Sequence, residues 1–170
     1  MDQDLQRYLN DHLAGSQSAL VLIQDLADRQ EDTDEAEFFS GLKRKVEGDQ
    51  ELLKNLLTSI GQDESTFLKA AGSLTGKASR LKLLWEGMEP GKLGMFEALE
   101  MLSLGIQGKR LLWVVLREIA PHFPEWAGTD FASLELEAIE QRDAVEERRV
   151  AHGRETFAST ERRAAKAPAN

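Results

Sequence analysis

The sequence contains no cysteine, which excludes disulfide bonds, thiolate metal sites and cysteine nucleophiles. It also has no long apolar run. The longest, 111–116, is far shorter than the ~20 residues that a membrane-spanning helix needs. Basic residues are few, 21 against 30 acidic ones, which gives a formal net charge of -9. Because phosphate contacts need a basic surface, we expect no nucleic acid as a partner, and we expect no membrane either.

The chain has the length of one domain, 170 residues. Its first ten residues, MDQDLQRYLN, are polar and acidic, so they do not resemble a signal peptide, and we expect a cytoplasmic protein. Residues 159–170, STERRAAKAPAN, are small or polar and offer nothing to bury. The sequence therefore predicts a single helical-bundle domain over 1–158 and a flexible C-terminal tail over 159–170.

Apolar residues recur every three or four positions in five segments, which is the pattern of amphipathic helices. The predicted helices cover about 4–28, 34–60, 65–86, 95–120 and 131–157. Gly61 is a typical helix stop, and Asp130 is a typical N-cap. The segment PHFPEWAGTD (121–130) is expected to be structureless, with Phe123 and Trp126 holding it against the end of the bundle. No strand pattern is present, so the fold class is all-α.

The helix predicted over 95–120 is apolar nearly all the way round. A helix of this kind is normally buried among other helices, so we expect Leu111 to lie near the centre of the core. The segment 61–94 is rich in small residues and is expected to pack outside the four main helices. Polar residues on the inner faces of those four helices then carry the most information about function.

Four polar residues are predicted to form one buried layer. His12 and Asp49 lie at nearly equal distances from the turn near residue 31, so an antiparallel helix pair brings them to the same height. We expect a hydrogen bond between them. The same count along the two later helices reaches Gln107, or its neighbour Gly108, and Gln141.

A second predicted contact lies further along the bundle. The count places Glu100 level with Arg148, or with Arg149 if the register slips by one residue, and Glu97 one turn nearer the end. A buried carboxylate needs such a partner. Three interpretations of these polar residues stay open: a hydrogen-bonded network that fixes helix register, a metal or catalytic centre, and a small-molecule pocket beside the layer.

Two segments carry a family resemblance. YLNDHLAGS (8–16) and EALEMLSLGIQGKRLLW (97–113) resemble segments of an uncharacterised bacterial group of ferritin-like helical-bundle proteins. The resemblance implies a ferritin-like four-helix bundle with an additional crossover helix within 61–94. Ferritin-like di-iron proteins carry Glu-x-x-His on two of their helices. This sequence has no Glu-x-x-His, so the resemblance implies that di-iron chemistry is lost.

The sequence thus predicts a non-enzymatic cytoplasmic helical-bundle protein that acts by binding or assembly. It needs no cofactor, and its partner is a second copy of itself or another protein. The alternative is a ferritin-like metalloprotein or oxidoreductase with an unusual metal site in the bundle core. In that case His12 and Asp49 are the candidate ligands, with or without Glu97 or Glu100.

Overall fold

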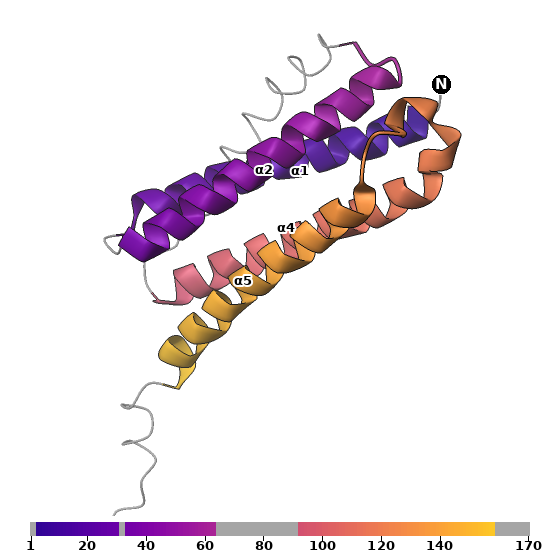
Figure 1. The fold of residues 1–170 in the computed structure, drawn as a ribbon. Coiled ribbons are helices and arrows are strands. Elements are labelled where there is room, and N and C mark those ends of the chain that lie inside the picture. Colours follow the sequence, from indigo (N-terminus) through magenta and orange to yellow (C-terminus); the bar gives the residue numbers. More distant parts are fainter. Residues whose placement is uncertain (1–2, 31–32, 64–91, 159–170) are drawn as a thin grey trace, which may run out of the picture.

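The computed structural model describes residues 3–30, 33–63 and 92–158 (Figure 1). These ranges contain four long helices, two short 3-10 helices and no strand, which confirms the all-α class. The bounds are α1 (Gln3–Asp28), α2 (Thr33–Ser59), α4 (Lys92–Ile119), η1 (Ala120–His122), η2 (Pro124–Trp126) and α5 (Phe131–Phe157). The predicted helix over 65–86 and the predicted tail over 159–170 lie outside the described residues.

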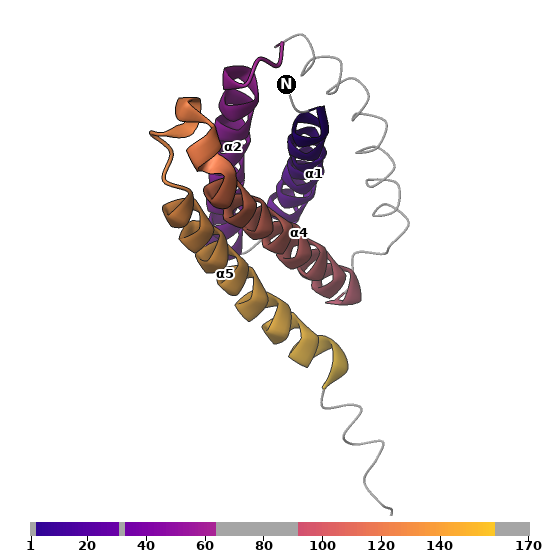
Figure 2. The same cartoon turned by 90° about the vertical axis from the view of Figure 1, so that its right-hand side faces the viewer.

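The four helices form two antiparallel hairpins that lie on each other as two layers (Figure 1). One layer is α1 with α2 and the other is α4 with α5, and the second layer crosses the first at an angle (Figure 2). The indole nitrogen of Trp126 donates to Ser59 Oγ at 3.0 Å, so the C-terminal ends of α2 and α4 meet. Helices α2 and α4 therefore run in the same direction, and α1 and α5 run against them.

A single apolar core fills the space between the layers. All four helices contribute side chains that are almost fully buried, among them Leu9, Ile23, Phe39, Leu57, Leu99, Leu112, Trp113, Leu116 and Val145. The inner positions follow the three-four spacing seen in the sequence, because that spacing lines one face of a helix. None of the described helices is long and apolar enough to cross a membrane.

Helix α4 differs from its predicted environment, because it is not buried all the way round. Leu111 is 52% exposed, and its neighbours Leu112 and Trp113 take the central position instead. The reason is geometrical. Helix α4 packs against α5 on one side and α1 on another, so its third face has no neighbour among the described residues.

The connection 121–130 is more ordered than predicted, since η1 and η2 occupy most of its first half. Each of these turns has a proline near its start, where the missing N–H costs no hydrogen bond. Trp126 is 1% exposed and stacks on Phe123 with ring centroids 4.2 Å apart, so the predicted anchoring is confirmed. The predicted cap is confirmed too, because the Asp130 carboxylate accepts from the Ser133 backbone N–H at 3.0 Å.

A pair of leucine truncations tests this placement of the core. Leu112→Ala removes a buried side chain and should lower the free energy of unfolding by about 2–5 kcal/mol. Leu136→Ala removes a side chain that is mostly exposed on α5, and should change it by less than about 0.5 kcal/mol. Urea unfolding followed by circular dichroism measures both. Similar losses for the two variants would contradict the burial of α4 described above.

Candidate binding site

A cluster of three polar side chains joins three helices in the interior. The ammonium group of Lys109 on α4 donates to Asp49 Oδ2 on α2 and to Gln141 Oε1 on α5. The side chains of Lys109 and Asp49 are only 14% and 12% exposed, and Gln141 is buried. Charge-assisted hydrogen bonds of this kind are about twice as strong as neutral ones. The cluster therefore fixes the relative height of α2, α4 and α5.

The predicted layer was partly correct in its members. Asp49 and Gln141 both belong to the observed cluster, because each accepts from Lys109. Gln107 does not belong to it, because its side chain accepts from Arg142 Nη1 at 2.8 Å between α4 and α5. Lys109 stands in its place. The sequence carried a signal for this, since Lys109 lies at helical spacing from Ile106 and Trp113, both of which are buried.

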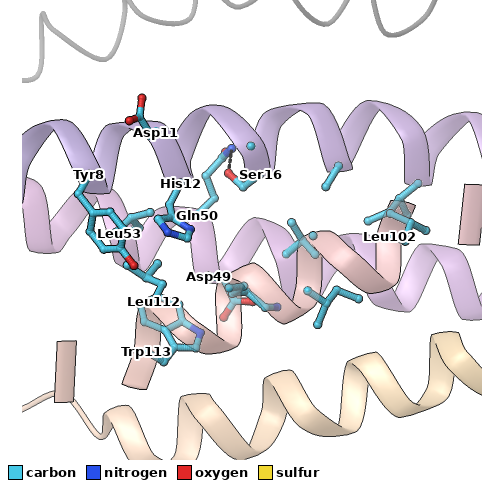
Figure 3. Close-up of a pocket in the computed structure, with 17 residues that line it drawn as sticks. Tyr8, Asp11, His12, Ser16, Asp49, Gln50, Leu53, Leu102, Leu112 and Trp113 are labelled. Atoms are coloured by element: carbon cyan, nitrogen blue, oxygen red, sulfur yellow. Dashed lines mark hydrogen bonds and ion pairs between the residues drawn. The ribbon is translucent and has the colours of Figure 1, made fainter. Parts of the chain in front are cut away.

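His12 makes a different contact from the one predicted. The predicted hydrogen bond between His12 and Asp49 is wrong, because Asp49 Oδ2 accepts from Lys109 instead. The His12 ring packs edge-on against Tyr8, with ring centroids 4.7 Å apart. Burial lowers the pKa of His12, and the nearby Asp11 carboxylate opposes this. His12 and Asp49 nevertheless line one cavity, as their equal heights require (Figure 3).

This cavity has a volume of about 440 Å³ and lies between α1, α2 and α4. Its walls are mostly apolar, and each of the three helices also contributes polar residues, Asp11 on α1 among them. The lining includes Ile23, Val46, Leu53, Leu102, Ile106, Leu112 and Trp113, with Tyr8, His12, Ser16, Asp49, Gln50 and Lys109 as the main polar members. On one wall Gln50 Nε2 donates to Ser16 Oγ at 2.9 Å, which fixes both side chains (Figure 3).

Two glycines leave space in this cavity. Gly15 on α1 and Gly105 on α4 both line it, and a Cβ added at either would meet no atom within 4 Å. Glycine is unfavourable inside a helix, so nothing about helix formation explains it here. Both residues lie at helical spacing from other lining residues, His12 for Gly15 and Lys109 for Gly105. Glycine at these two positions is a signal for an open cavity that was not recognised in the sequence.

Hydrogen-bond donors are in surplus around the cluster. Trp113 Nε1 and Gln141 Nε2 are both buried and have no hydrogen-bond partner among the described residues. Trp113 lines the cavity, and Gln141 contacts Lys109, which lines it too. Unpaired buried polar atoms are uncommon in native proteins and each needs an explanation. The third donor of the Lys109 ammonium group is the donor of this cluster that a molecule in the cavity could use, because Lys109 itself lines the cavity.

The other predicted site residues lie away from the cavity. The Glu100 side chain is 51% exposed, not buried as predicted. It pairs with Arg149 at 3.3 Å, the partner that was expected if the register slipped by one residue. Arg148 instead pairs with Glu35 on α2 at 3.0 Å and stacks over the Phe38 ring. Glu97 is half-buried and does not line the cavity.

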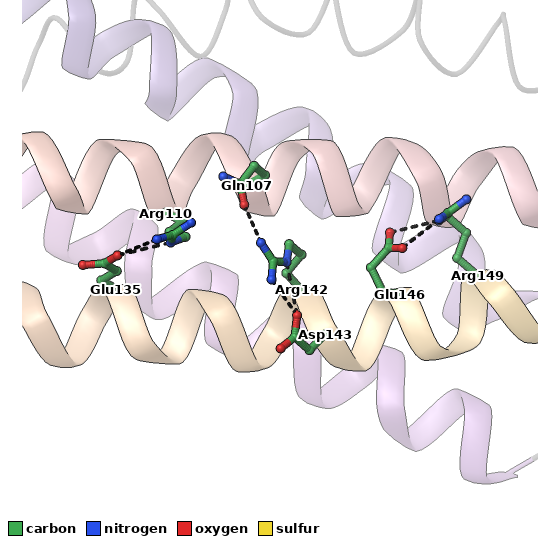
Figure 4. A network of polar contacts seen from close by, with 7 residues as sticks. All are labelled: Gln107, Arg110, Glu135, Arg142, Asp143, Glu146 and Arg149. Atoms are coloured by element: carbon green, nitrogen blue, oxygen red, sulfur yellow. Dashed lines mark hydrogen bonds and ion pairs between the residues drawn. The ribbon is translucent and has the colours of Figure 1, made fainter.

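Ion pairs also explain how the heavily charged α5 packs against α4 (Figure 4). Arg110 and Arg117 both bind Glu135, at 3.0 and 2.8 Å. Further along, Arg149 donates to Glu146 on its own helix at 2.8 Å and to Glu100 on α4 at 3.3 Å. The Arg149–Glu146 pairing lowers the pKa of Glu146 and raises that of Arg149. These contacts lie beside the cavity's wall helix and stabilise the hairpin, not the cavity itself.

Among the described residues, no three His, Asp or Glu side chains come together to hold a metal ion. Comparison of the chain with protein-family models, with curated proteins and with solved structures finds no match. Within the described helices, the site itself combines an apolar cavity with a neutralised buried ion pair and unpaired buried donors beside it.

The buried pair gives a direct test of the cluster. Lys109→Met or Asp49→Leu alone leaves an uncompensated charge in the interior, and each should cost about 3–5 kcal/mol of unfolding free energy. The double variant removes both charges and should recover much of that loss. Urea unfolding of the four proteins measures the coupling between the two sites. Mild single effects that simply add would mean that the two groups are solvated and independent.

His12 predicts a pH dependence of stability. Its pKa is lowered in the folded protein, so the unfolded chain binds the proton first as the pH falls. The stability that neutral His12 contributes is therefore present above the ordinary histidine pKa of about 6.5 and is lost below it. His12→Gln should show a smaller loss of unfolding free energy than the parent protein between neutral and mildly acidic pH. An equal loss in both proteins would rule out this role for His12.

Proposed function

We propose that this chain is a non-enzymatic, cytoplasmic helical-bundle protein that binds a small, largely apolar molecule in the cavity between α1, α2 and α4. The observation that carries the proposal is the cavity itself: mostly apolar walls, an open volume of about 440 Å³ and polar residues that include the Lys109–Asp49 pair. Ligand pockets in proteins are usually apolar, with a few polar groups that fix orientation, and measure roughly 300–1,000 Å³.

The polarity of the site favours a molecule with an acceptor oxygen. Lys109 is an ammonium group with three donors, of which Asp49 and Gln141 use two. The preferred ligand then has an apolar body and one carbonyl, hydroxyl or carboxylate group.

The same cluster supports a binding role over a catalytic one. Asp49 and Lys109 neutralise each other, so the carboxylate is not an isolated negative charge and the lysine is held as a protonated ammonium group, not as a neutral nucleophile. A general base has to reach its proton with an available lone pair, and an activated lysine has to be neutral. The cluster instead holds the inner wall of the cavity at a fixed position, which suits a site that recognises a molecule and does not transform it.

A ferritin-like relationship belongs to this proposal. In the described helices, α1 and α5 run one way and α2 and α4 run the other, so the two central helices in sequence are parallel. Bundles of the ferritin type have this order, with one long crossover between their hairpins. In such a bundle the interior between helices is the usual place for a bound group, which agrees with the position of the cavity.

Binding of the neutral fluorescent probe N-phenyl-1-naphthylamine tests the proposal. The parent protein should bind it saturably at one site per chain. Gly105→Leu places a side chain into the open space of the cavity and should weaken binding at least 10-fold. Gly48→Leu is the matched control, since Gly48 is a helical glycine with equally open surroundings but does not line the cavity. Equal binding by Gly105→Leu and Gly48→Leu would reject this site.

Displacement of the probe tests the polarity of the ligand. Decanoic acid and 1-decanol each carry an acceptor oxygen, whereas decylammonium carries donors only. With donors in surplus around Lys109, the acid and the alcohol should displace the probe at lower concentrations than the amine. Preferential displacement by the amine would show that the acidic residues, not the donors, dominate recognition.

A further inference from the structure

Helix α4 carries a row of large apolar side chains on the face that points away from the bundle. We call Leu93, Met101, Leu104, Leu111 and Val115 the outer row; each is between 43% and 64% exposed. Helices α1 and α2 lie on the other side of α4 (Figure 2), where Leu102, Ile106 and Trp113 are buried. Single exposed leucines are ordinary, but a contiguous exposed row marks an interaction surface.

Four of the five members of the outer row are arranged nearly symmetrically about Gly108. Met101 lies seven residues before it and Val115 seven after, while Leu104 and Leu111 lie four before and three after. We propose that a second copy of this chain packs on the outer row, with the two α4 helices antiparallel and the two-fold axis at Gly108. This sets Met101 opposite Val115 of the second copy and Leu104 within one residue of its Leu111, so these four positions are complementary to themselves as a two-fold interface requires. Leu93 has no counterpart, because its related position, 123, lies beyond the end of α4.

Gly108 suits the centre of such an interface. A Cβ added there would meet no atom within 4 Å, so nothing in the described part of its own chain requires a glycine. Glycine is also unfavourable inside a helix. Without a side chain at the axis, the two helix backbones can approach closely, and the three-four spacing of the outer row lets its side chains interlock on either side.

The available area reaches what a specific dimer needs. At about half exposure each, the four paired side chains offer on the order of 400 Å² of apolar surface per copy, within the roughly 300–600 Å² of the largest patch on a typical protein, which is often functional. Two copies bury about twice that, and since interface cores are roughly 65% apolar, the whole interface reaches about 1,200 Å². That value is the lower end for stable interfaces of about 1,200–2,000 Å², so the dimer is a modest one.

The net negative charge of each copy makes the dimer sensitive to salt. Glu100 and Glu118 flank the outer row and are 51% and 73% exposed. Antiparallel packing brings Glu100 of one copy near Glu118 of the other. Each of these carboxylates is ion-paired within its own chain, with Arg149 and Arg117, so most of the repulsion between the copies comes from the formal net charge of -9 on each. Salt screens repulsion between exposed charges, so the dimer should tighten as ionic strength rises. An association driven by attraction between surface charges would weaken instead.

Sedimentation equilibrium of the full chain, with a monomer mass of 19.0 kDa, tests the proposal. The parent protein should associate to a dimer at micromolar concentrations, more tightly in high salt. Leu104→Glu puts a charge in the outer row and should raise the dissociation constant at least 10-fold. Leu136→Glu is the matched control, because Leu136 on α5 is equally exposed and lies outside the row. Circular dichroism confirms that both variants are folded.

Cross-linking gives a second readout that does not depend on Leu104→Glu being folded. The chain has no cysteine, so Gly108→Cys introduces a single thiol at the proposed axis and should form a disulfide-linked dimer on mild oxidation. Gly48→Cys is the control at another open helical glycine, and it should stay monomeric. A parent protein that remains monomeric at high concentration and high salt would overturn the proposal and assign the outer row to a different occupant. Equal cross-linking of Gly108→Cys and Gly48→Cys would also overturn it.

Discussion

The interior of this bundle holds an ammonium group, and the arrangement of three helices depends on how that charge is neutralised. Lys109 enters from α4, Asp49 accepts its charge from α2, and Gln141 accepts from α5. A charge removed from water is costly unless a partner of opposite charge and further hydrogen bonds replace the lost solvation. Only one relative height of α2, α4 and α5 brings the three groups together. The cluster therefore fixes a register that apolar packing alone would leave less defined.

That register also shapes the cavity. Asp49 and Lys109 contribute to its lining, while Gly15 and Gly105 leave the space between α1 and α4 unfilled. The two hairpins contact each other mainly through α1 and α4, whereas α4 and α5 pack closely along their lengths. A loose junction between two well-packed hairpins is where a helical bundle can keep an internal space. Stability is then supplied elsewhere, by the core around Leu116 and Trp126 and by the ion pairs of α5.

The sequence was informative wherever one helix could be considered by itself. The bounds of α1, α2 and α5, the cap at Asp130 and the anchoring by Trp126 all follow from local spacing and residue type. Errors arose where two helices had to be placed together. Counting residues from a turn predicted the level of Asp49 and Gln141, but it chose Gln107 over Lys109, because a count gives height and not the direction in which a side chain points.

The exposure of α4 could not be predicted for a related reason. An apolar residue on a helix is buried only if a neighbouring helix covers its face, and the sequence of α4 does not say how many faces are covered. Leu111 and Leu112 are adjacent and chemically identical, yet the first is half exposed and the second is buried. The exposed face of α4 then becomes a feature to explain, whereas the sequence suggested a uniformly buried helix.

The most direct test of this account is NMR observation of the Lys109 ammonium group. Exposed lysine ammonium protons exchange rapidly with water and are not detected near neutral pH, whereas a buried, hydrogen-bonded group is protected. The account predicts one protected ammonium signal that shows through-space contacts to the side chains of Asp49 and Gln141 and is absent from Lys109→Met. An ammonium group at Lys109 that exchanges as fast as those of the exposed lysines would contradict the central role of the cluster.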